Sequence, residues 1–333
     1  MNYNSAKMPL GKLGKSTILK GFSALKRVAE VIENPDGDAA KEYGGADAAY
    51  AELSGAYYSI IPHAFGRVAP ELDLMDSLSD MAVASTIMGA KTSSSAAHPV
   101  HPMDARFLAL GLSSIVPVAR DSREFRAVDK YARDTEVRNS HCGLAITSVF
   151  GIERESETAA WASAGHDRLN DGERLLLWHG SRSTNFAGIL KEGLRIAPPE
   201  APSTGYMFGR GIYFADSLNY CHAYLSENNG LLLLCEVAAR PFYEQSNSNY
   251  GADIECRAAN KRSTKGLGRS APARWTDAGV VLDNDALRGC MMPAGRRRLR
   301  TVQPALHHNE YIVYNLDQIR LRYLVMVDSK PRS

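Results

Sequence analysis

Three side chains beside apolar stretches of this sequence could carry chemistry. His179 follows an apolar run of four residues and precedes Gly180, and glycine lets a ligand approach the backbone closely. Tyr213 stands in a short apolar stretch that Gly211 begins. Glu310 opens another apolar stretch, where an unpaired carboxylate is expensive to bury. A carboxylate in such a place can stabilise positive charge as a glycosidic bond breaks, and it can act as a general base.

Each of these residues also has a plain structural interpretation. A lone histidine at the end of a strand is more often structural than functional, and a tyrosine among apolar residues is usually part of a core. A glutamate at the start of a strand can point to solvent from a sheet edge. Residue types alone leave both interpretations open, so the elements that position the three side chains must be considered.

Helices are predicted in the first part of the chain, because apolar residues recur there at spacings of three and four. Ser16 can cap the first helix, and the turn-forming segment Asn34–Asp38 ends it. The apolar positions of the three predicted helices are Ile18, Phe22, Leu25, Val28 and Ile32; Ala49, Leu53, Tyr57 and Ile61; and Leu72, Met75, Leu78 and Ala82. Helices of this kind can pack into a small bundle.

The pattern changes after Gly89–Pro102, which is small, polar and proline-bearing, as linkers are. Residues 144–152 then alternate as a half-buried strand does. Four short apolar runs predict buried strands, at Leu175–Trp178, Leu231–Val237, Tyr311–Tyr314 and Tyr323–Val327. One clear helix is predicted among them, at Thr184–Lys191, closed by Gly193.

Because strands outnumber helices in this part, the fold class is predicted to be α+β. We expect a small helical bundle at residues 1–90, a linker at 91–102, and a domain with a mixed or antiparallel sheet at 103–333. No internal repeat is visible in the sequence.

Composition and charge exclude several classes of protein. The chain has 333 residues, of which 44% are hydrophobic and 23% charged, which is typical of a globular protein with room for two domains. The net charge of +2 gives no general signal for nucleic-acid binding. Two basic clusters, Arg296–Arg300 and Lys261–Arg269, are interpreted as solvated loops, with nuclear import or phosphate binding as the alternative.

Cysteine usage and hydropathy point to a reduced compartment and give no sign of a membrane segment. The five cysteines form no CxxC pair, which disfavours a disulfide framework or a zinc finger. The pairs His141–Cys142 and His307–His308 have no further ligand at metal spacing, so we predict no metal site. The N-terminus lacks the apolar core of a signal peptide, and no run approaches the roughly 20 apolar residues that span a bilayer.

Six motifs in a fixed order give the chain a family resemblance. They are MPLGKL at Met8–Leu13, IIPHAFG at Ile60–Gly66, FGIERESE at Phe150–Glu157, the long run Leu175–Asp216, KGLGRSAP at Lys265–Pro272 and NEYIVYNL at Asn309–Leu316. Over nearly all its length the chain resembles the poly(ADP-ribose) polymerase family, in the DNA-damage-responsive branch that joins a helical regulatory domain to an ADP-ribosyltransferase catalytic domain. The resemblance implies NAD⁺ as the substrate and no metal.

The resemblance also implies roles for the three side chains. His179, Tyr213 and Glu310 match the family's histidine–tyrosine–glutamate triad, in the version associated with chain elongation. His179 would bond the adenine-ribose hydroxyl, Tyr213 would stack on the nicotinamide ring, and Glu310 would accept a hydrogen bond from the 2′-hydroxyl of the nicotinamide ribose. The other NAD-binding residues that it implies are Gly180, Ser181, Asn185, Gly188, Arg195, Tyr206, Phe214, Ala215, Ser217 and Tyr220.

The implied activity is that of an NAD⁺ ADP-ribosyltransferase, a pentosyltransferase that modifies protein acceptors, including itself, and elongates poly(ADP-ribose). Two features depart from the family pattern. Only three residues separate Asp216 from Tyr220, so the usual acceptor-side lysine is missing, and His308 stands where a tyrosine is usual. A mono-ADP-ribosyltransferase or NAD glycohydrolase is therefore an alternative, and a silent NAD-binding scaffold is another.

Regulation is expected to differ from that of the family. The family's regulatory domain usually opens with a helix before the Met8–Leu13 segment, and DNA-sensing modules precede it; this sequence contains neither. We expect a fragment or a differently regulated homologue, with a weakened autoinhibitory domain and high basal activity. The resemblance implies that the helix with Asp76 and Asp80 shields the adenosine subsite, with Asp80 close to the loop that bears Arg195; a solvated helix face is the alternative. The resemblance implies a nuclear protein of DNA repair, without a clear import signal beyond Arg296–Arg300.

Overall fold

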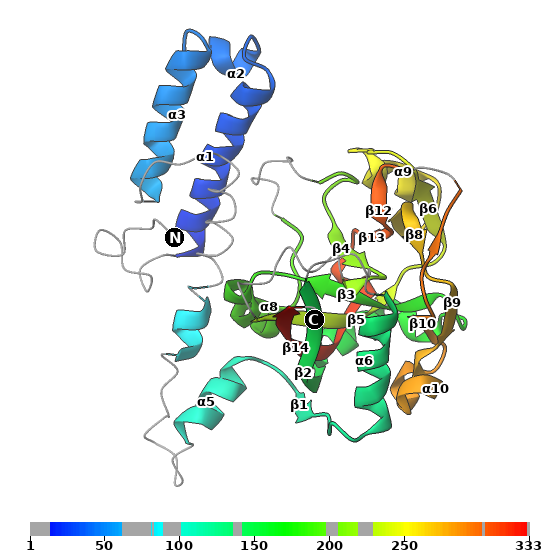
Figure 1. Ribbon diagram of the computed structural model, residues 1–333. Helices are drawn as coiled ribbons and strands as arrows, with labels where there is room; N and C mark the ends of the chain where they lie inside the picture. Colours follow the sequence, from blue (N-terminus) through cyan, green and yellow to red (C-terminus); the bar gives the residue numbers. More distant parts are fainter. Residues whose placement is uncertain are drawn as a thin grey trace. The chain divides into compact units, whose positions relative to one another are not determined.

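The computed structural model describes residues 14–61, 81, 83–88, 101–135, 142–197, 206–218, 229–301 and 304–331. The chain divides into two compact units (Figure 1). The first comprises Met1–Leu110, Thr184–Glu192 and Ala197–Gly205, and the second comprises Gly111–Ser183, Gly193–Ile196 and Tyr206–Ser333. The domain limits expected from the sequence, 1–90, 91–102 and 103–333, stay predictions. Asp76, Asp80 and, apart from Met81, the predicted third helix at 72–82 lie outside the described residues.

The first unit contains helices α1 (Lys15–Glu33), α2 (Asp38–Lys41), α3 (Ala46–Ile60), α5 (Pro102–Ala109) and α8 (Phe186–Glu192). The long helices α1 and α3 pack along one another through two apolar clusters. One cluster joins Ile18, Phe22 and Leu25 to Tyr57 and Ile61. The spacing of three and four therefore identified both helices and most of their buried faces.

One residue was wrongly predicted to lie on the buried face of α1. Ile32 is 49% exposed, whereas Val31 is fully buried. The reason is α2, which the sequence pattern did not reveal. Val31 packs with Ala40 of α2 and with Ala49 and Leu53 of α3, so the covered side of α1 turns toward Val31 at its end.

The second unit is built on a mixed sheet with the strand order β1-β2-β14-β5-β3-β4-β13-β7-β6, to which β10 and β9 are added beside β3. Its strands are β1 (Ser114–Pro117), β2 (Cys142–Glu153), β3 (Arg174–Gly180), β4 (Ile212–Ala215), β5 (Asn229–Ala238), β6 (Phe242–Gln245), β7 (Ser263–Gly266), β9 (Arg274–Asp277), β10 (Cys290–Ala294), β13 (Glu310–Val313) and β14 (Ile319–Pro331). A smaller sheet has the order β11-β8-β12, from β8 (Gly268–Ala271), β11 (Arg298–Leu299) and β12 (Leu306–His308).

Most neighbours in the large sheet are antiparallel, and β10–β3 and β6–β7 are parallel. The predicted α+β class with a mixed sheet is therefore confirmed. The apolar runs became its central strands: Leu175–Trp178 of β3 are completely buried, and β5 lies between β14 and β3. A strand covered on both faces needs apolar residues at every position, which is why these runs do not alternate.

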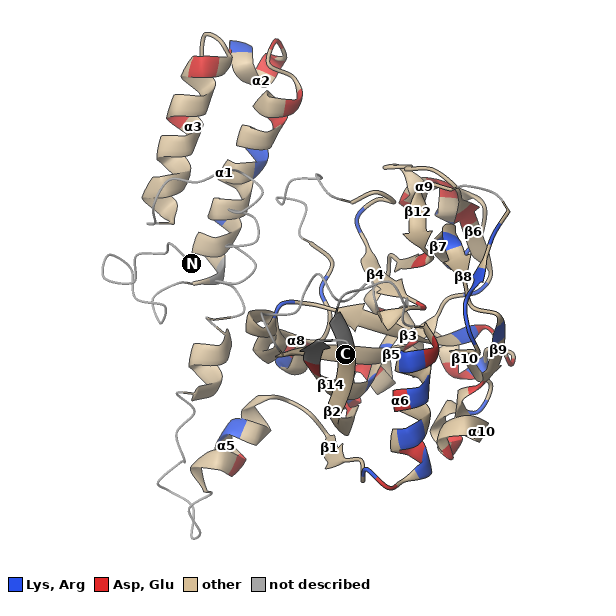
Figure 2. Cartoon of the chain, in the orientation of Figure 1, with Lys and Arg blue, Asp and Glu red and all other residues tan. Residues whose placement is uncertain are grey.

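The helix predicted among the strands at Thr184–Lys191 is present as α8, but the prediction that it would be the one clear helix there was wrong. The described residues include α6 (Arg123–Thr135), α7 (Glu155–Ser163), α9 (Ala252–Ala258) and α10 (Ala278–Leu282). On α6, Phe125, Val128, Tyr131 and Ala132 are buried, while charged residues cover the other side (Figure 2). Tyr131 donates a hydrogen bond to the Leu176 carbonyl at 3.1 Å. With Ala127, five apolar residues of α6 are buried among its many charges, and their packing in the core stabilises the helix.

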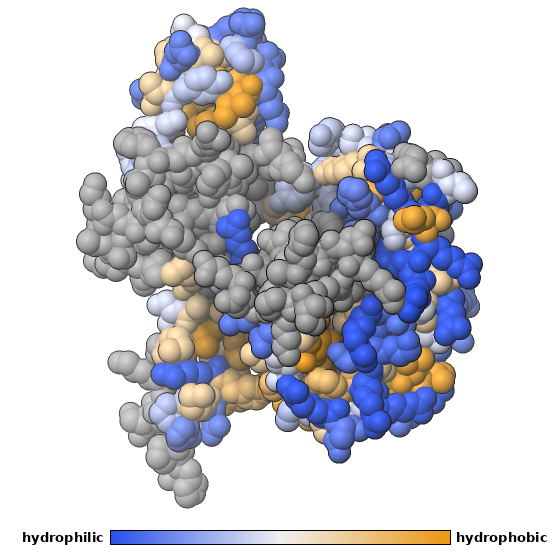
Figure 3. Space-filling view, viewed as in Figure 1, coloured by the Kyte–Doolittle hydropathy of each residue, from blue (hydrophilic) through white to orange (hydrophobic). Residues whose placement is uncertain are grey.

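On the side of the second unit seen in Figure 3, the described surface is mainly hydrophilic, with small apolar areas between the polar ones. Among the described residues, no helix combines the length and the apolar character that crossing a bilayer requires.

Candidate active site

Three neighbouring strands carry His179, Tyr213 and Glu310. In the sheet order, β3, β4 and β13 follow one another. His179 is the next-to-last residue of β3, Tyr213 lies within β4, and Glu310 is the first residue of β13. The register pairs Glu310 with Ala215 and Ile312 with Tyr213. Because directly opposite side chains share a face, and residues two apart do also, Glu310 and Tyr213 project from the same face.

The imidazole of His179 is fixed to the backbone of the next strand. Its Nδ1 lies 2.9 Å from the carbonyl oxygen of Tyr213. Because a carbonyl only accepts, Nδ1 carries the proton in this bond, and Nε2 is the acceptor of the neutral ring. Burial lowers the pKa of His179, which favours that neutral form. The ring also packs on Phe214, with 5.6 Å between the ring centroids.

The phenol of Tyr213 is held by the loop that precedes its strand. Its hydroxyl accepts a hydrogen bond from the Phe208 amide at 3.0 Å and donates one to the Gly209 carbonyl at 2.9 Å. Burial raises the pKa of Tyr213, so the phenol stays protonated. Since its hydroxyl is already bonded, Tyr213 offers a ligand its ring, next to Tyr206 at a centroid distance of 6.2 Å.

The carboxylate of Glu310 is buried, with 8% of the residue exposed. Burial raises the pKa of Glu310 to about 7. Within the described part of the chain, no donor or cation forms a hydrogen bond or ion pair with it. The register places it on the same face of the sheet as Tyr213, and its charge contributes to the raised pKa of Tyr213. A buried carboxyl group without a donor is ready to accept a hydrogen bond from a ligand.

The two neighbours of Glu310 are anchored to Asp216. Asn309 Nδ2 and the Tyr311 hydroxyl donate to Asp216 Oδ2 at 2.6 and 2.9 Å. Arg297 Nη1 forms an ion pair with Asp216 Oδ1 at 2.7 Å, and the exposed fractions of these two side chains are 6% and 0%. Alternation sends Asn309 and Tyr311 to the face opposite Glu310. The Asp216 cluster therefore fixes the register of β13 and, through it, the place of Glu310.

Arg297 corrects the sequence interpretation of the cluster Arg296–Arg300 as a solvated loop. Its Nε donates to Ser270 Oγ at 2.8 Å, and its side chain points inward to Asp216. The pairing of β11 with β8 begins at the next residue, and alternation then places neighbouring arginines on opposite sides. Four arginines in one run gave no sign of which one would be buried, and Asp216 lies far away in the sequence.

The structure places several other residues of the implied NAD site near the triad. Gly180 ends β3 opposite Leu232, and Phe214 and Ala215 are fully buried in β4. Ser181, which follows Gly180, is half-buried, and Tyr206 packs beside Tyr213. Arg195 is exposed, and its place relative to the triad stays a prediction. Their roles toward a ligand stay predictions.

The roles of four further residues of the implied site stay predictions as well. Asn185, in the short helix Ser183–Asn185, and Gly188 of α8 belong to the first unit. Tyr220 lies outside the described residues. Ser217 is fully buried, and its hydroxyl donates to the Thr135 carbonyl at 2.8 Å.

His308 lies in β12 immediately before the anchored segment. Burial, together with the nearby Arg297, lowers the pKa of His308 to about 4, so the ring is neutral at physiological pH. Its Nδ1 is buried, and none of the described residues forms a hydrogen bond with it. The side chain that stands where a tyrosine is usual in the family pattern is therefore an uncharged imidazole.

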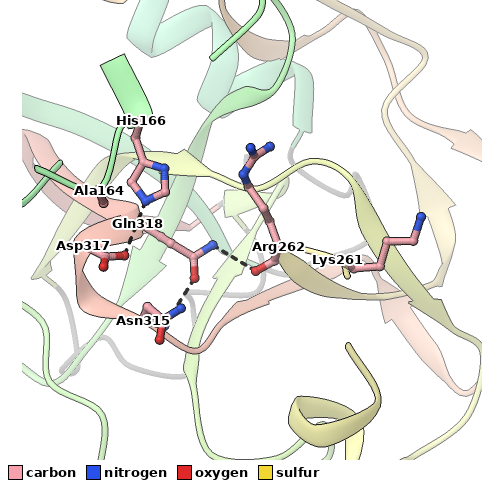
Figure 4. Close-up of a pocket in the computed structure, with 7 residues that line it drawn as sticks. All are labelled: Ala164, His166, Lys261, Arg262, Asn315, Asp317 and Gln318. Carbon is pink, nitrogen blue, oxygen red and sulfur yellow. Dashed lines mark hydrogen bonds and ion pairs between the residues drawn. The ribbon is translucent and has the colours of Figure 1, made fainter. Parts of the chain in front are cut away.

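A separate polar cleft, which the sequence did not suggest, is shown in Figure 4. Its volume is about 280 Å³, and it is lined by Ala164, His166, Lys261, Arg262, Asn315, Asp317 and Gln318. His166 Nε2 and Asp317 Oδ1 are 3.4 Å apart across it. None of these residues belongs to the triad. Among the described residues, no three His, Cys, Asp or Glu side chains are grouped to hold a metal ion.

Comparison with known families shows which family has this arrangement of strands and side chains. Residues 122–329 match the model of the poly(ADP-ribose) polymerase catalytic domain. This range includes His179, Tyr213 and Glu310. The chain belongs to the poly(ADP-ribose) polymerase family. Residues 1–107 match the model of the family's regulatory domain. The resemblance inferred from the six motifs is thereby confirmed.

Individual poly(ADP-ribose) polymerases are similar over almost the whole chain. Poly [ADP-ribose] polymerase 2-B of Oryza sativa subsp. japonica is 38% identical over 355 residues, covering 98% of this chain and 53% of the relative. Poly [ADP-ribose] polymerase 2 of Homo sapiens is 38% identical over 347 residues, covering 98% and 54%. Poly [ADP-ribose] polymerase 1 of Gallus gallus is 37% identical over 336 residues, covering 96% and 31%. The chain thus spans about half the length of the type 2 relatives.

Proposed function

We propose that this chain is an NAD⁺ ADP-ribosyltransferase. In this proposal it breaks the bond between nicotinamide and ribose, transfers ADP-ribose to protein acceptors and elongates poly(ADP-ribose). The observation that carries the proposal is the carboxyl group of Glu310, buried and without a donor, beside Tyr213 in a domain that matches the family's catalytic model.

The binding of NAD⁺ would use groups whose donor and acceptor roles are already set. Nε2 of neutral His179 can accept from a ribose hydroxyl, because Nδ1 donates to Tyr213. The backbone of Gly180 can exchange hydrogen bonds with the nicotinamide carboxamide. The ring of Tyr213, fixed by its bonded hydroxyl, can stack on the nicotinamide, which contributes roughly 0.5–1.5 kcal/mol beyond burial.

The reaction would depend on Glu310. Its carboxylate accepts a hydrogen bond from the ribose 2′-hydroxyl, which stabilises the positive charge that develops on the ribose as the bond to nicotinamide breaks. Nicotinamide leaves with the bonding electron pair and becomes neutral. The oxygen of an acceptor hydroxyl then bonds to the anomeric carbon, and its proton passes to Glu310 and on to water.

The test is the isosteric substitution Glu310→Gln. We expect nicotinamide release to fall by a factor of about 10² or more, and elongation to disappear, because the amide cannot take the proton or offset positive charge. NAD⁺ binding, measured by calorimetry, should change little. An equal loss of binding and turnover would contradict the role assigned to Glu310.

His308 favours a second candidate, mono-ADP-ribosyl transfer or NAD⁺ hydrolysis. A neutral imidazole stands beside the segment that carries Glu310, so the acceptor side differs from the family pattern while the donor side matches it. Labelled NAD⁺ and a gel that resolves product length separate the candidates. Long products support elongation, single additions support mono-transfer, and free ADP-ribose supports hydrolysis. The absence of nicotinamide release would instead leave a non-catalytic scaffold.

Nuclear localisation and a role in DNA repair are proposed from family membership. Fluorescence microscopy of the tagged chain tests the localisation. Turnover measured with and without nicked DNA tests the expected high basal activity, which a requirement for DNA would contradict.

A further inference from the structure

The short loop before β4 lies outside the sheet, so its backbone groups need other partners. Residues 206–209 form a turn in which the Gly209 amide donates to the Tyr206 carbonyl at 3.1 Å. Phe208 is fully buried, and Gly209 is buried with a φ of +78°, a conformation that favours glycine. A buried backbone group without a hydrogen-bond partner costs free energy. Side chains from other strands therefore have to satisfy this loop.

The hydroxyl of Tyr314 satisfies the Phe208 carbonyl. The two oxygens are 2.8 Å apart, and the single phenol proton points to the carbonyl because a carbonyl only accepts. Thr264 Oγ1 lies 2.7 Å from the same hydroxyl and therefore supplies the proton of that second bond. Burial raises the pKa of Tyr314, so the phenol keeps the proton that it donates. Thr264, Tyr314 and the Phe208 carbonyl thus form one chain of hydrogen bonds.

This chain ends on the peptide plane that lies between the two bonds of the Tyr213 hydroxyl. The Phe208 carbonyl and the Gly209 amide belong to one rigid plane. Tyr314 holds that plane at its oxygen, and the Tyr206 carbonyl holds it at its nitrogen. The planes on either side contain the Phe208 amide and the Gly209 carbonyl, which bond the Tyr213 hydroxyl at 3.0 and 2.9 Å. A rotation of the central plane would therefore displace both partners of Tyr213.

The strands bring Tyr314 close to this loop. Strands β4 and β13 are neighbours, and their register pairs Tyr213 with Ile312 (Figure 1). Tyr314 directly follows β13, two residues after Ile312. A Cβ added at Gly211 would lie 2.6 Å from Ile312 Cγ2 and 2.9 Å from Tyr314 Cδ1. The segment that joins the loop to β4 therefore runs directly against Tyr314.

Tyr213 is the residue that the loop positions. Its hydroxyl lies at the far end of the phenol ring, so the place where the hydroxyl is held sets the direction in which the ring extends from β4. The buried carbonyl of Phe208 needs a donor in any case, and a purely structural role for Tyr314 would stop there. The bonds of Tyr213 to both flanking groups add a consequence, because a shift of the loop moves the ring that a ligand would meet.

We propose that Tyr314 is a positioning residue for the nicotinamide subsite: its hydroxyl holds the Phe208 carbonyl and, through the loop, sets the place of the Tyr213 ring. The proposal rests on the proposed function, in which that ring stacks on nicotinamide. Tyr314 does not touch NAD⁺ in this role. Its effect is confined to the nicotinamide end, because the contacts proposed for His179 and Glu310 do not pass through the loop.

The substitution Tyr314→Phe removes the hydroxyl and leaves the ring. Two ligands that need no turnover separate its effects: nicotinamide, and ADP-ribose, which lacks the nicotinamide. We expect the dissociation constant of nicotinamide, measured by calorimetry, to rise about three- to tenfold, up to the full value of aromatic stacking, and that of ADP-ribose to stay within about twofold. Unchanged nicotinamide affinity would overturn the proposal. So would equal weakening of both ligands, which indicates general damage to the fold.

Tyr323→Phe is the matched control. Tyr323 is a buried tyrosine of β14 whose hydroxyl donates to Glu124 Oε1 at 2.5 Å and accepts from Asn284 Nδ2 at 3.1 Å. Both variants thus lose a phenol hydroxyl that makes two hydrogen bonds, and both should lower the melting temperature. Only Tyr314→Phe should weaken nicotinamide binding. A similar loss of nicotinamide affinity in the control would reject a specific role for Tyr314.

A double-mutant cycle tests whether Tyr314 acts through Tyr213. Tyr213→Phe keeps the stacking ring but removes both of its bonds to the loop. In that background Tyr314→Phe should weaken nicotinamide binding by less than about twofold, because the hydroxyl that the loop holds is already absent. Additive losses would contradict the proposed route. Absence of nicotinamide release by the wild type would instead overturn the proposed function.

Discussion

The backbone carbonyl of Tyr213 accepts a hydrogen bond from Nδ1 of His179 at 2.9 Å. This bond settles the tautomer of the imidazole, since only a protonated Nδ1 can donate to a carbonyl. It also joins the imidazole of His179 to the backbone of β4, the strand that carries Tyr213. The acceptor nitrogen Nε2 is thereby kept for a ligand.

The substitution His179→Asn should separate these two functions. The amide can still donate to the Tyr213 carbonyl, but it offers no acceptor where Nε2 stands. We expect the KM for NAD⁺ to rise about tenfold, the value of one hydrogen bond of roughly 1.4 kcal/mol, with little change in the melting temperature. His179→Ala should lower the melting temperature as well. Wild-type NAD⁺ affinity in His179→Asn would rule out the assigned contact.

The pKa of Glu310, about 7 in the free protein, predicts a pH-dependent rate. Only the ionised carboxylate supplies the negative charge that stabilises the developing positive charge, so kcat/KM for nicotinamide release should rise with pH and level off above about 7. In the complex the ribose hydroxyl stabilises the charged form, so kcat should show a lower apparent pKa. Initial rates across this range test both. A kcat/KM that stays flat through neutral pH would contradict the assignment.

The raised pKa of Glu310 also predicts that ionisation of its carboxyl group destabilises the folded protein. The folded pKa of Glu310 lies above its unfolded value of 4.5, so the folded protein binds the proton more tightly. The associated stability is present below pH 4.5 and is lost as pH rises through about 7. The side-chain amide introduced by Glu310→Gln resembles the protonated acid at every pH. We expect this variant to exceed the wild type by up to roughly 3 kcal/mol in free energy of unfolding at pH 8, and by little near pH 4. Denaturant titrations at both pH values measure the difference.

The sequence predicted the triad because each member lies in a local motif. The apolar run before His179 and the stretch after Glu310 became β3 and β13. What it could not predict was the partner of Arg297, because the pairing with Asp216 depends on the register of β11 and β8 and on the path of the chain between them. Long-range polar contacts leave no periodic trace in a sequence.

Helix α6 illustrates a different limit of prediction from the sequence. Its segment Arg123–Thr135 contains many charged residues, but Phe125, Val128 and Tyr131 recur at a spacing of three, so a helical pattern was present in the sequence and was missed. The helix forms because Tyr131 and its neighbours are covered by the sheet, where Tyr131 bonds to the Leu176 carbonyl. The partner is again distant in the sequence. Local patterns thus located the strands with continuous apolar runs better than the helices that lie on them.

The buried pair of Asp216 and Arg297 should be strongly coupled. Arg297→Met removes the cation and leaves a buried carboxylate with only the neutral donors of Asn309 and Tyr311, which should cost about 3–5 kcal/mol. Asp216→Asn should cost a similar amount by leaving the guanidinium unpaired. The double variant should recover part of the loss, because neither charge then remains buried alone. Thermal unfolding of all four proteins gives the coupling energy, and simple additivity would show that the pair is not a unit.

Gly268 tests whether the place of Glu310 depends on the close contact between β8 and β12. A Cβ added at Gly268 would overlap the His308 carbonyl carbon and lie 2.5 Å from the Asn309 amide nitrogen, both backbone atoms that have little freedom to move. Gly268→Ala should therefore break the bond from the Gly268 amide to Asn309 Oδ1, 2.9 Å long, and cost about 1–3 kcal/mol. Nicotinamide release should fall at least tenfold, because the segment that carries Glu310 shifts.

Gly151→Ala is the matched control, since its added Cβ would meet the Val116 carbonyl oxygen at an ordinary 3.8 Å. Equal activity in the two variants would mean that Glu310 is positioned by Asp216 and β4 without help from β8.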